Sequence, residues 1–140
     1  MNISKLSNAL GALVKDDTKW LTISDSFKLC VGRLSVESQV YNSRMSDWIS
    51  KNKQVDQEIF NNIYAYVINE DTISFISEVL IIDWDLTDDD GKKVKFTSKG
   101  VKEILEHPSL GVPICTRVLQ FAMLGENFNA KWEDKIVKNS

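Results

Sequence analysis

Residues 81–96 read IIDWDLTDDDGKKVKF, and the conformation of this stretch decides how the two halves of the chain are joined. It begins with two isoleucines and Trp84, continues through an aspartate-rich run to Gly91, and ends at Phe96, which Thr97 follows. Aspartate and glycine favour turns, glycine because it adopts positive φ without strain. We expect a structural joint in which Trp84 anchors a helix end in the core, the chain turns at Gly91, and Phe96 with Thr97 starts the next helix.

Five aspartates between residues 83 and 90 invite comparison with a calcium loop. An EF-hand loop has glycine at position six and a bidentate glutamate at position twelve. With Gly91 at position six, Leu86 falls at position one and Thr97 at position twelve, so the two terminal ligands are missing. We therefore predict no metal site and no cofactor. Weak cation binding by the acidic turn is left open.

Phosphate and nucleic acid are disfavoured as ligands. The chain lacks the two glycines that precede Lys-Ser/Thr in a phosphate-binding loop. Five lysines between residues 92 and 102 follow the aspartates and are followed by Glu103 and Glu106, so local neutralisation is the simpler account of them. The net charge of -3 gives no general attraction to a polyanion. We expect neither nucleic acid nor a membrane as a partner.

The composition predicts one soluble domain over residues 1–140. Apolar residues make up 43% of the chain and charged residues 26%, as in globular proteins, and no Gly/Ser tract suggests a linker. Cys30 and Cys115 each lie in an apolar stretch, which predicts buried thiols of a reduced protein. No apolar run approaches the roughly 18 residues that a membrane span needs. We expect the protein to act in the cytoplasm.

The predicted fold class is mainly α with a small N-terminal β-hairpin (α+β), in one compact domain of about five or six helices. Apolar residues alternate with period two on both sides of Ser24-Asp25-Ser26, which predicts the hairpin over residues 19–33. Residues 35–106 are predicted to form a helical body with an acidic turn over 83–91. Residues 112–137 are predicted to form a C-terminal helical segment that breaks or bends at Gly125.

Apolar spacing divides the helical body. A first helix is predicted to follow Ser35 as its N-cap. A second is predicted over 54–69, with a buried stripe of Val55, Ile59, Ile63, Tyr66 and Val67. A third is predicted over 71–86, although its β-branched residues make a strand the competing prediction for 79–84. A fourth is predicted from the cap Thr97 to about Glu106.

A narrow apolar stripe of Phe128, Trp132 and Ile136 marks the polar C-terminal segment. Helical spacing of four residues places the three side chains on one face. Such a stripe docks either on the body of its own protein or on a partner, and both alternatives stay open. If the stripe binds a partner, these three residues are the contacts.

Catalysis has little material in this sequence. The one histidine, His107, precedes a proline, and no second histidine completes a zinc site or a nucleophile–base pair. Carboxylate pairs occur in any acidic protein, and no spacing singles one out. We expect that the protein is not an enzyme.

The order of several segments resembles the tail assembly chaperones of long-tailed bacteriophages. The resemblance rests on SFKLCVGRLSVESQV (26–40), EVLIIDWDLTDDDGKKVKFTSKGVKEIL (78–105), the late NF pair and the final KNS. Its most specific part is Asp83 and Trp84 followed by the acidic turn, Gly91, Val94, Phe96 and Thr97. The resemblance therefore adds Asp83 to the expected structural anchors.

What the resemblance implies is a small non-enzymatic protein of the host cell cytoplasm. It implies binding to the long helical tape measure protein, help for tail tube subunits that polymerise around it, and absence from the mature virion. Two alternatives stand beside it. One is a small structural tail or connector component of the virion. The other is a host-directed regulator or an enzyme that uses Asp88, Asp89 and Asp90. Homo-oligomerisation is left open.

Overall fold

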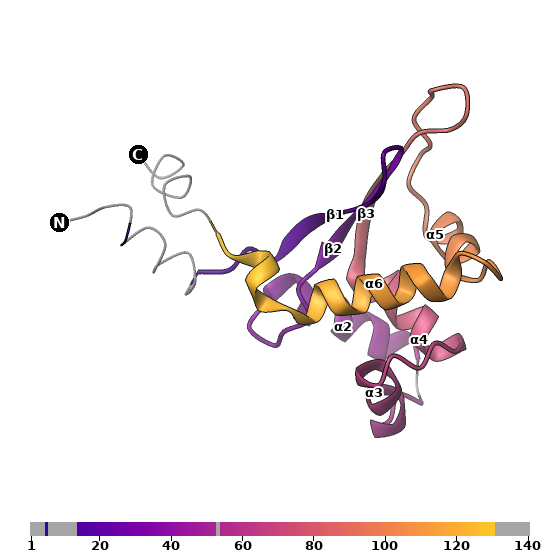
Figure 1. The fold of residues 1–140 in the computed structure, drawn as a ribbon. Coiled ribbons are helices and arrows are strands. Elements are labelled where there is room, and N and C mark those ends of the chain that lie inside the picture. The colour runs from indigo at the N-terminus through magenta and orange to yellow at the C-terminus, as the bar shows by residue number, and fades with distance from the viewer. Residues whose placement is uncertain (1–4, 6–13, 53, 131–140) are drawn as a thin grey trace.

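The computed structural model of the protein describes residue 5 and residues 14–52 and 54–130 (Figure 1). The strands are β1 (Thr18–Ser24), β2 (Phe27–Gly32) and β3 (Ile81–Leu86). The helices are α2 (Gln39–Lys51), α3 (Gln57–Tyr64), α4 (Glu70–Phe75), α5 (Ser98–Leu105) and α6 (Gly111–Met123), with a π-helical turn at Ile76–Leu80 and a 3₁₀ turn at Gly125–Phe128. The predicted α+β fold class is confirmed.

The strands form an antiparallel sheet in the order β1-β2-β3, and the predicted hairpin supplies β1 and β2. Leu29 in β2 pairs with Leu21 of β1 and with Trp84 of β3. Side chains alternate between the faces of a strand, so this row of three lies on one face. That face is the core face, because Leu29 is only 1% exposed.

The helix predicted over 71–86 is wrong in its second half. α4 begins after its cap Asn69 and passes into the π-helical turn, and the chain then extends as β3. The run Val79–Ile82 is rich in β-branched residues, which suit a strand. Pairing with β2 decides the conformation, because it supplies partners for buried backbone groups and makes a marginal hairpin into a stable sheet.

One extra residue in β3 determines which of its side chains reach the core. Residues 30 and 31 of β2 pair with Asp83 and Ile81, so Ile82 is a β-bulge. Positions three apart on a regular strand point to opposite faces. Because of the bulge, Ile81 and Trp84 both point inward, with exposures of 0% and 8%.

Helices α2 to α5 each begin at a short polar side chain that accepts a hydrogen bond from the N–H group three residues later. These N-caps are Ser38, Asp56, Asn69 and Thr97. The predicted cap Thr97 is confirmed. The cap predicted at Ser35 is wrong, because its hydroxyl accepts from the N–H of Glu37 in a turn that precedes Ser38.

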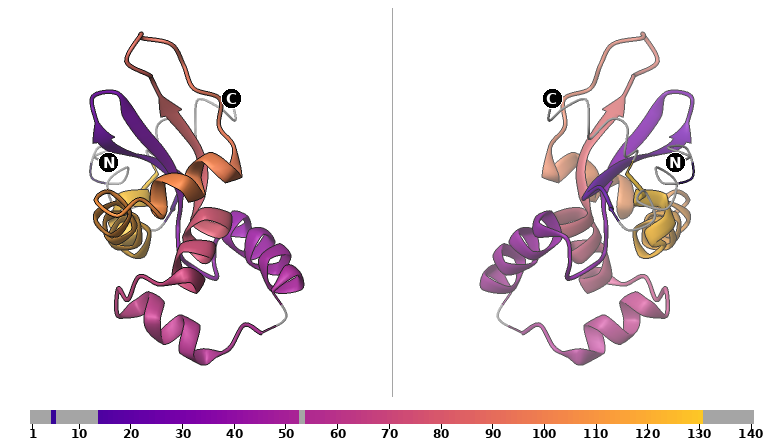
Figure 2. Two further views of the ribbon diagram at one scale, coloured as in Figure 1. Left: turned by 90° about the vertical axis from the view of Figure 1, so that its right-hand side faces the viewer. Right: turned by 90° about the vertical axis from the view of Figure 1, so that its left-hand side faces the viewer.

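The core lies between the sheet and the helices. α6 crosses one face of the sheet, and the π-helical turn also contacts the strands (Figures 1 and 2). Both cysteines are buried and unpaired, as predicted. α3 and α4 form a lobe, residues 56–75, at the end of the molecule opposite the loop that follows β3 (Figure 2).

The Trp84 indole joins β3 to α5. Its ring meets the rings of Phe27 and Phe96 edge-on, with centroid distances of 6.3 and 5.4 Å. The indole N–H donates to the carbonyl oxygen of Val94 at 2.8 Å. A Cβ atom at Gly100 would lie 2.7 Å from the indole, so only glycine lets the first turn of α5 come this close.

Replacing Trp84 with alanine should lower the free energy of unfolding by roughly 3 to 5 kcal/mol, because it opens a cavity between the sheet and α5. The midpoint of urea unfolding measures the loss. Trp20→Ala is the matched control, since Trp20 is 51% exposed and its removal should cost about 0.5 kcal/mol. An unchanged midpoint for Trp84→Ala contradicts its place in the core.

Gly100→Ala should also destabilise the protein, by about 1 to 3 kcal/mol. Alanine normally stabilises a helix interior relative to glycine by roughly 0.5 to 1 kcal/mol. Here the added methyl group would meet the Trp84 ring and also the cap oxygen of Thr97, at 2.9 Å. Lys99→Ala on the exposed side of the same turn should be nearly neutral. Thermal unfolding of the two variants decides the sign, and a more stable Gly100→Ala would refute the close contact.

Candidate functional site

The acidic turn after β3 is organised by its own side chains. The carboxylate of Asp88 accepts hydrogen bonds from the backbone N–H groups of Asp90 and Lys92, each at 2.9 Å. Gly91 has φ +79°, and Lys93 returns beside Thr87 in an antiparallel bridge. The turn therefore closes a loop whose two ends are held together by this isolated bridge.

This loop does not arrange its aspartates as metal ligands. Asp88 is occupied by backbone donors, and Asp85 forms an ion pair with Lys93. The carboxylate of Asp83 accepts from the N–H of Trp84 at 2.8 Å. Among the residues that the structure describes, no group of three or more His, Cys, Asp or Glu side chains is placed to hold a metal ion.

The predicted C-terminal stripe is described only in part. Phe128 is 0% exposed and packs edge-on against Phe121, with a centroid distance of 5.4 Å. Its side chain therefore contributes to the core and not to an open surface. Trp132 and Ile136 lie outside the described residues, as does the end of the helical segment predicted over 112–137.

The thiols and the histidine have structural surroundings. Burial raises the pKa of the Cys115 thiol to about 12, and burial is also the main reason that the pKa of Cys30 is raised. Both thiols are therefore protonated and unreactive at neutral pH.

The Nδ1 atom of His107 accepts hydrogen bonds from the N–H groups of Ser109 and Leu110, at 3.0 and 3.3 Å. His107 thus holds the turn between α5 and α6.

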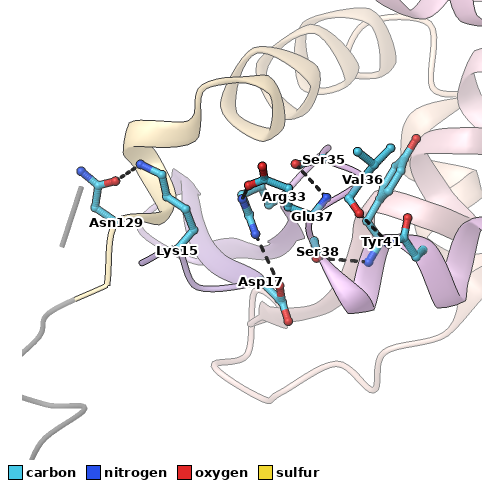
Figure 3. A network of polar contacts seen from close by, with 10 residues as sticks. Lys15, Asp17, Arg33, Ser35, Val36, Glu37, Ser38, Tyr41 and Asn129 are labelled. Atoms are coloured by element: carbon cyan, nitrogen blue, oxygen red, sulfur yellow. Dashed lines mark hydrogen bonds and ion pairs between the residues drawn. The ribbon is translucent and has the colours of Figure 1, made fainter. Parts of the chain in front are cut away.

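A polar network ties the segment before β1 to the segment after α6 (Figure 3). Lys15 donates to the side-chain oxygen of Asn129. Arg33 is 7% exposed and lies between Asp17 and Glu37, with nitrogen–oxygen distances of 3.8 Å to each carboxylate. Two carboxylates of the chain itself compensate this buried charge. Sequence periodicity gives no signal for such a network, because its members are distant in the chain.

The hollow between α2 and the π-helical turn is polar and open. It measures about 210 Å³ and is lined in part by Arg44, Asp47 and Glu78. The guanidinium group of Arg44 donates to the carbonyl oxygens of Val79 and Ile81, both at 3.0 Å. Burial lowers the pKa of Arg44. The arginine fastens α2 to the start of β3, and small-molecule sites are usually more apolar and enclosed than this hollow.

Exposed apolar side chains are the most distinctive surface feature of the described residues. Ten large ones are 37% exposed or more, and they are Trp20, Val36, Ile49, Tyr64, Tyr66, Val67, Val94, Leu110, Val112 and Leu124. Three of them fall in one unbroken run, Tyr64-Ala65-Tyr66-Val67, in which every residue is exposed. We call this run the α3 corner.

The α3 corner exists because α3 ends earlier than its apolar pattern predicts. The stripe predicted over 54–69 places Tyr66 and Val67 inward, but the helix stops at Tyr64. The N–H of Tyr66 donates to Ile63 at 3.2 Å, and the N–H of Val67 donates to Asn62 at 2.9 Å, which is the hydrogen-bond pattern of a Schellman C-cap. The sequence signal for this surface is the run of four apolar residues at 64–67, which is longer than one buried face of a helix can hold.

Tyr66 occupies the position of this cap that glycine usually takes. Its φ is +56°, and it is the one described residue other than glycine with positive φ. The left-handed conformation costs an L-residue roughly 1 to 2 kcal/mol. The chain therefore holds an exposed aromatic side chain at a strained position.

The segment around the α3 corner is strongly acidic. Residues 54–91 contain ten aspartate and glutamate residues and no lysine or arginine. Four of the ten lie in the α3–α4 lobe, and they are Asp56, Glu58, Glu70 and Asp71. In the described part of the chain, none of these four forms an ion pair. Among the described residues, no ion-pair partner therefore neutralises their negative charge.

Comparison with known proteins gives one match. Residues 35–139 match the family described as YdaY prophage protein, which is more than half of the chain. No curated protein and no solved structure matches the chain significantly. None of the described helices is both long enough and apolar enough to span a membrane.

Millimolar calcium should leave the melting temperature unchanged, because the carboxylate of Asp88 already serves backbone donors and Asp85 is paired with a lysine. A ligand that binds only the folded state raises the melting temperature. The measurement compares thermal unfolding in calcium, in magnesium and in a chelator. A rise specific to calcium that is lost in Asp89→Asn/Asp90→Asn would establish a cation site in the loop.

Proposed function

Because the chain belongs to the YdaY prophage protein family and is therefore phage-derived, we propose that it is a tail assembly chaperone. In this role it binds the tape measure protein, keeps it soluble and helps to recruit tail tube subunits. The proposal is supported by the phage origin together with the resemblance of residues 20–140 to tail assembly chaperones.

The observation that carries the proposal is the set of exposed apolar side chains on an acidic protein. Among the described residues, ten large apolar side chains are 37% exposed or more, while the chain has a net charge of -3. A tape measure protein presents long apolar helix faces until the tube encloses them. A chaperone for such faces needs apolar contacts to cover them and charge to keep the complex dissolved.

The proposed action is reversible binding without chemistry. The chaperone covers apolar faces of the tape measure protein in the host cytoplasm, and tube subunits displace it as they polymerise. The negative net charge limits competing binding to DNA. The chaperone then leaves the finished tail and is absent from the virion.

Co-expression with the tape measure protein encoded in the same phage genome tests this function. We expect the partner to move from the insoluble to the soluble fraction and to co-purify with the chaperone. An unrelated acidic protein of similar mass is the control for a general effect of expression. A tape measure protein that stays insoluble contradicts the proposal.

Mass spectrometry of purified particles separates a chaperone from a structural component. A chaperone should be absent from finished particles and present in lysates of infected or induced cells. A stoichiometric amount in the particle would instead identify a small structural tail or connector protein.

A further inference from the structure

We propose that the α3 corner, Tyr64 to Val67, is a docking surface for an amphipathic helical segment rich in lysine or arginine on another polypeptide. The inference deepens the proposed function, because that function identifies the polypeptide as the tape measure protein. It depends on the proposed function for this identity alone. The surface and the chemistry of its partner are inferred from this chain.

Exposure is the first observation. Tyr64 is 57% exposed, Tyr66 is 39% exposed and Val67 is 45% exposed, and Ala65 between them is also exposed. Exposure of four consecutive apolar residues to water is unfavourable. Protein surfaces therefore avoid such runs except where the run has a function. Tyrosine is enriched among the residues that dominate binding energy, because its ring buries a large area at a small entropy cost.

The backbone of the corner is the second observation. Tyr66 keeps φ at +56° where glycine would be free of strain. A strained residue persists only where the surrounding structure holds it, and such positions cluster at functional sites. The presence of a tyrosine at this strained position therefore points to a use of its side chain.

The corner is held firmly from below. Ile63 is 1% exposed and fixes the last turn of α3 in the core. The hydroxyl of Thr72, a residue that is 0% exposed, donates to the carbonyl oxygen of Val67 at 2.7 Å. Asn69 accepts from the N–H of Thr72 at 3.0 Å and so starts α4 beside the corner. A preorganised surface loses little conformational entropy when a partner binds.

Charge decides between the occupants. The four carboxylates of the α3–α4 lobe form no ion pair within the described chain, and residues 54–91 supply no cation to compensate them. A second copy bound at this face would bring two acidic lobes together, and an anionic membrane would also be repelled. A basic partner gains attraction and faster association instead. An amphipathic helix with basic flanks combines both properties.

The first experiment measures binding of a labelled synthetic peptide of about 18 residues, with leucines at helical spacing and lysines elsewhere. Tyr66→Gly is the informative variant, because it removes the side chain and also relieves the backbone strain. We expect a folded stability equal to or above that of the wild type, with peptide binding weakened roughly tenfold or more. Tyr64→Ser/Val67→Ser should weaken binding similarly.

The matched control is Lys99→Ser/Glu103→Ser, which replaces two exposed side chains of α5 outside the exposed apolar set and leaves the net charge unchanged. It should leave binding unchanged. A peptide in which glutamate replaces lysine should not bind the wild type. Equal affinity of the wild type and both α3-corner variants overturns the proposal, and so does a dimer of this chain that the same variants dissociate.

The second experiment repeats the comparison with the tape measure protein of the same phage. Loss of capture in the α3-corner variants but not in the control supports docking at this surface. Equal capture by the wild type and the variants contradicts docking at this surface but agrees with the chaperone function. If the wild type does not capture the tape measure protein but still binds the peptide through the α3 corner, the chaperone function is contradicted and the docking surface is supported.

Discussion

The burial of the Trp84 indole is the interaction on which the arrangement of the chain depends. The ring lies between Phe27 of the sheet and Phe96 ahead of α5, and its N–H satisfies the carbonyl of Val94. These contacts fasten the third strand to the hairpin and bring the helices after the acidic loop onto the same core. The loop reverses the chain, and the carboxylates of Asp88 and Asp85 stabilise that turn.

Local chemistry explains which parts of the fold the sequence could predict. The hairpin and the cap at Thr97 depend on residues close together in the chain, and both predictions are confirmed. β3 was open to two interpretations, because its aliphatic run suits either a buried helix or a strand. A neighbouring strand, β2, decides that choice, and it lies some fifty residues away in the sequence. Periodicity alone cannot report such a partner.

The α3 corner could not be predicted from the spacing of apolar residues either. Extending the apolar stripe of α3 by one more turn places Tyr66 and Val67 inside, whereas the Schellman cap, with Ala65 as C-cap and Tyr66 in the left-handed position after it, exposes them. A tyrosine in a position suited to glycine is not visible as a helix end in the sequence. Phe128 shows the converse, since a residue on a narrow stripe near the terminus is fully buried. The exposure of a side chain thus depends on where its helix ends. The spacing of apolar residues in the sequence predicts that end poorly.

The bulge at Ile82 has a consequence for how such proteins diverge. Because Ile81 and Trp84 are three positions apart, they share the core face only while Ile82 is bulged, whereas a chain without Ile82 would place them two apart, on one face of a regular strand. The length of the chain before the tryptophan is therefore tied to the presence of the bulge. The loop over residues 87–93 is under no such restriction, since its ribbon projects away from the helices (Figure 2). We therefore expect relatives of this chain to vary in length beyond the strand, and a relative with one residue fewer before the tryptophan to lack the bulge.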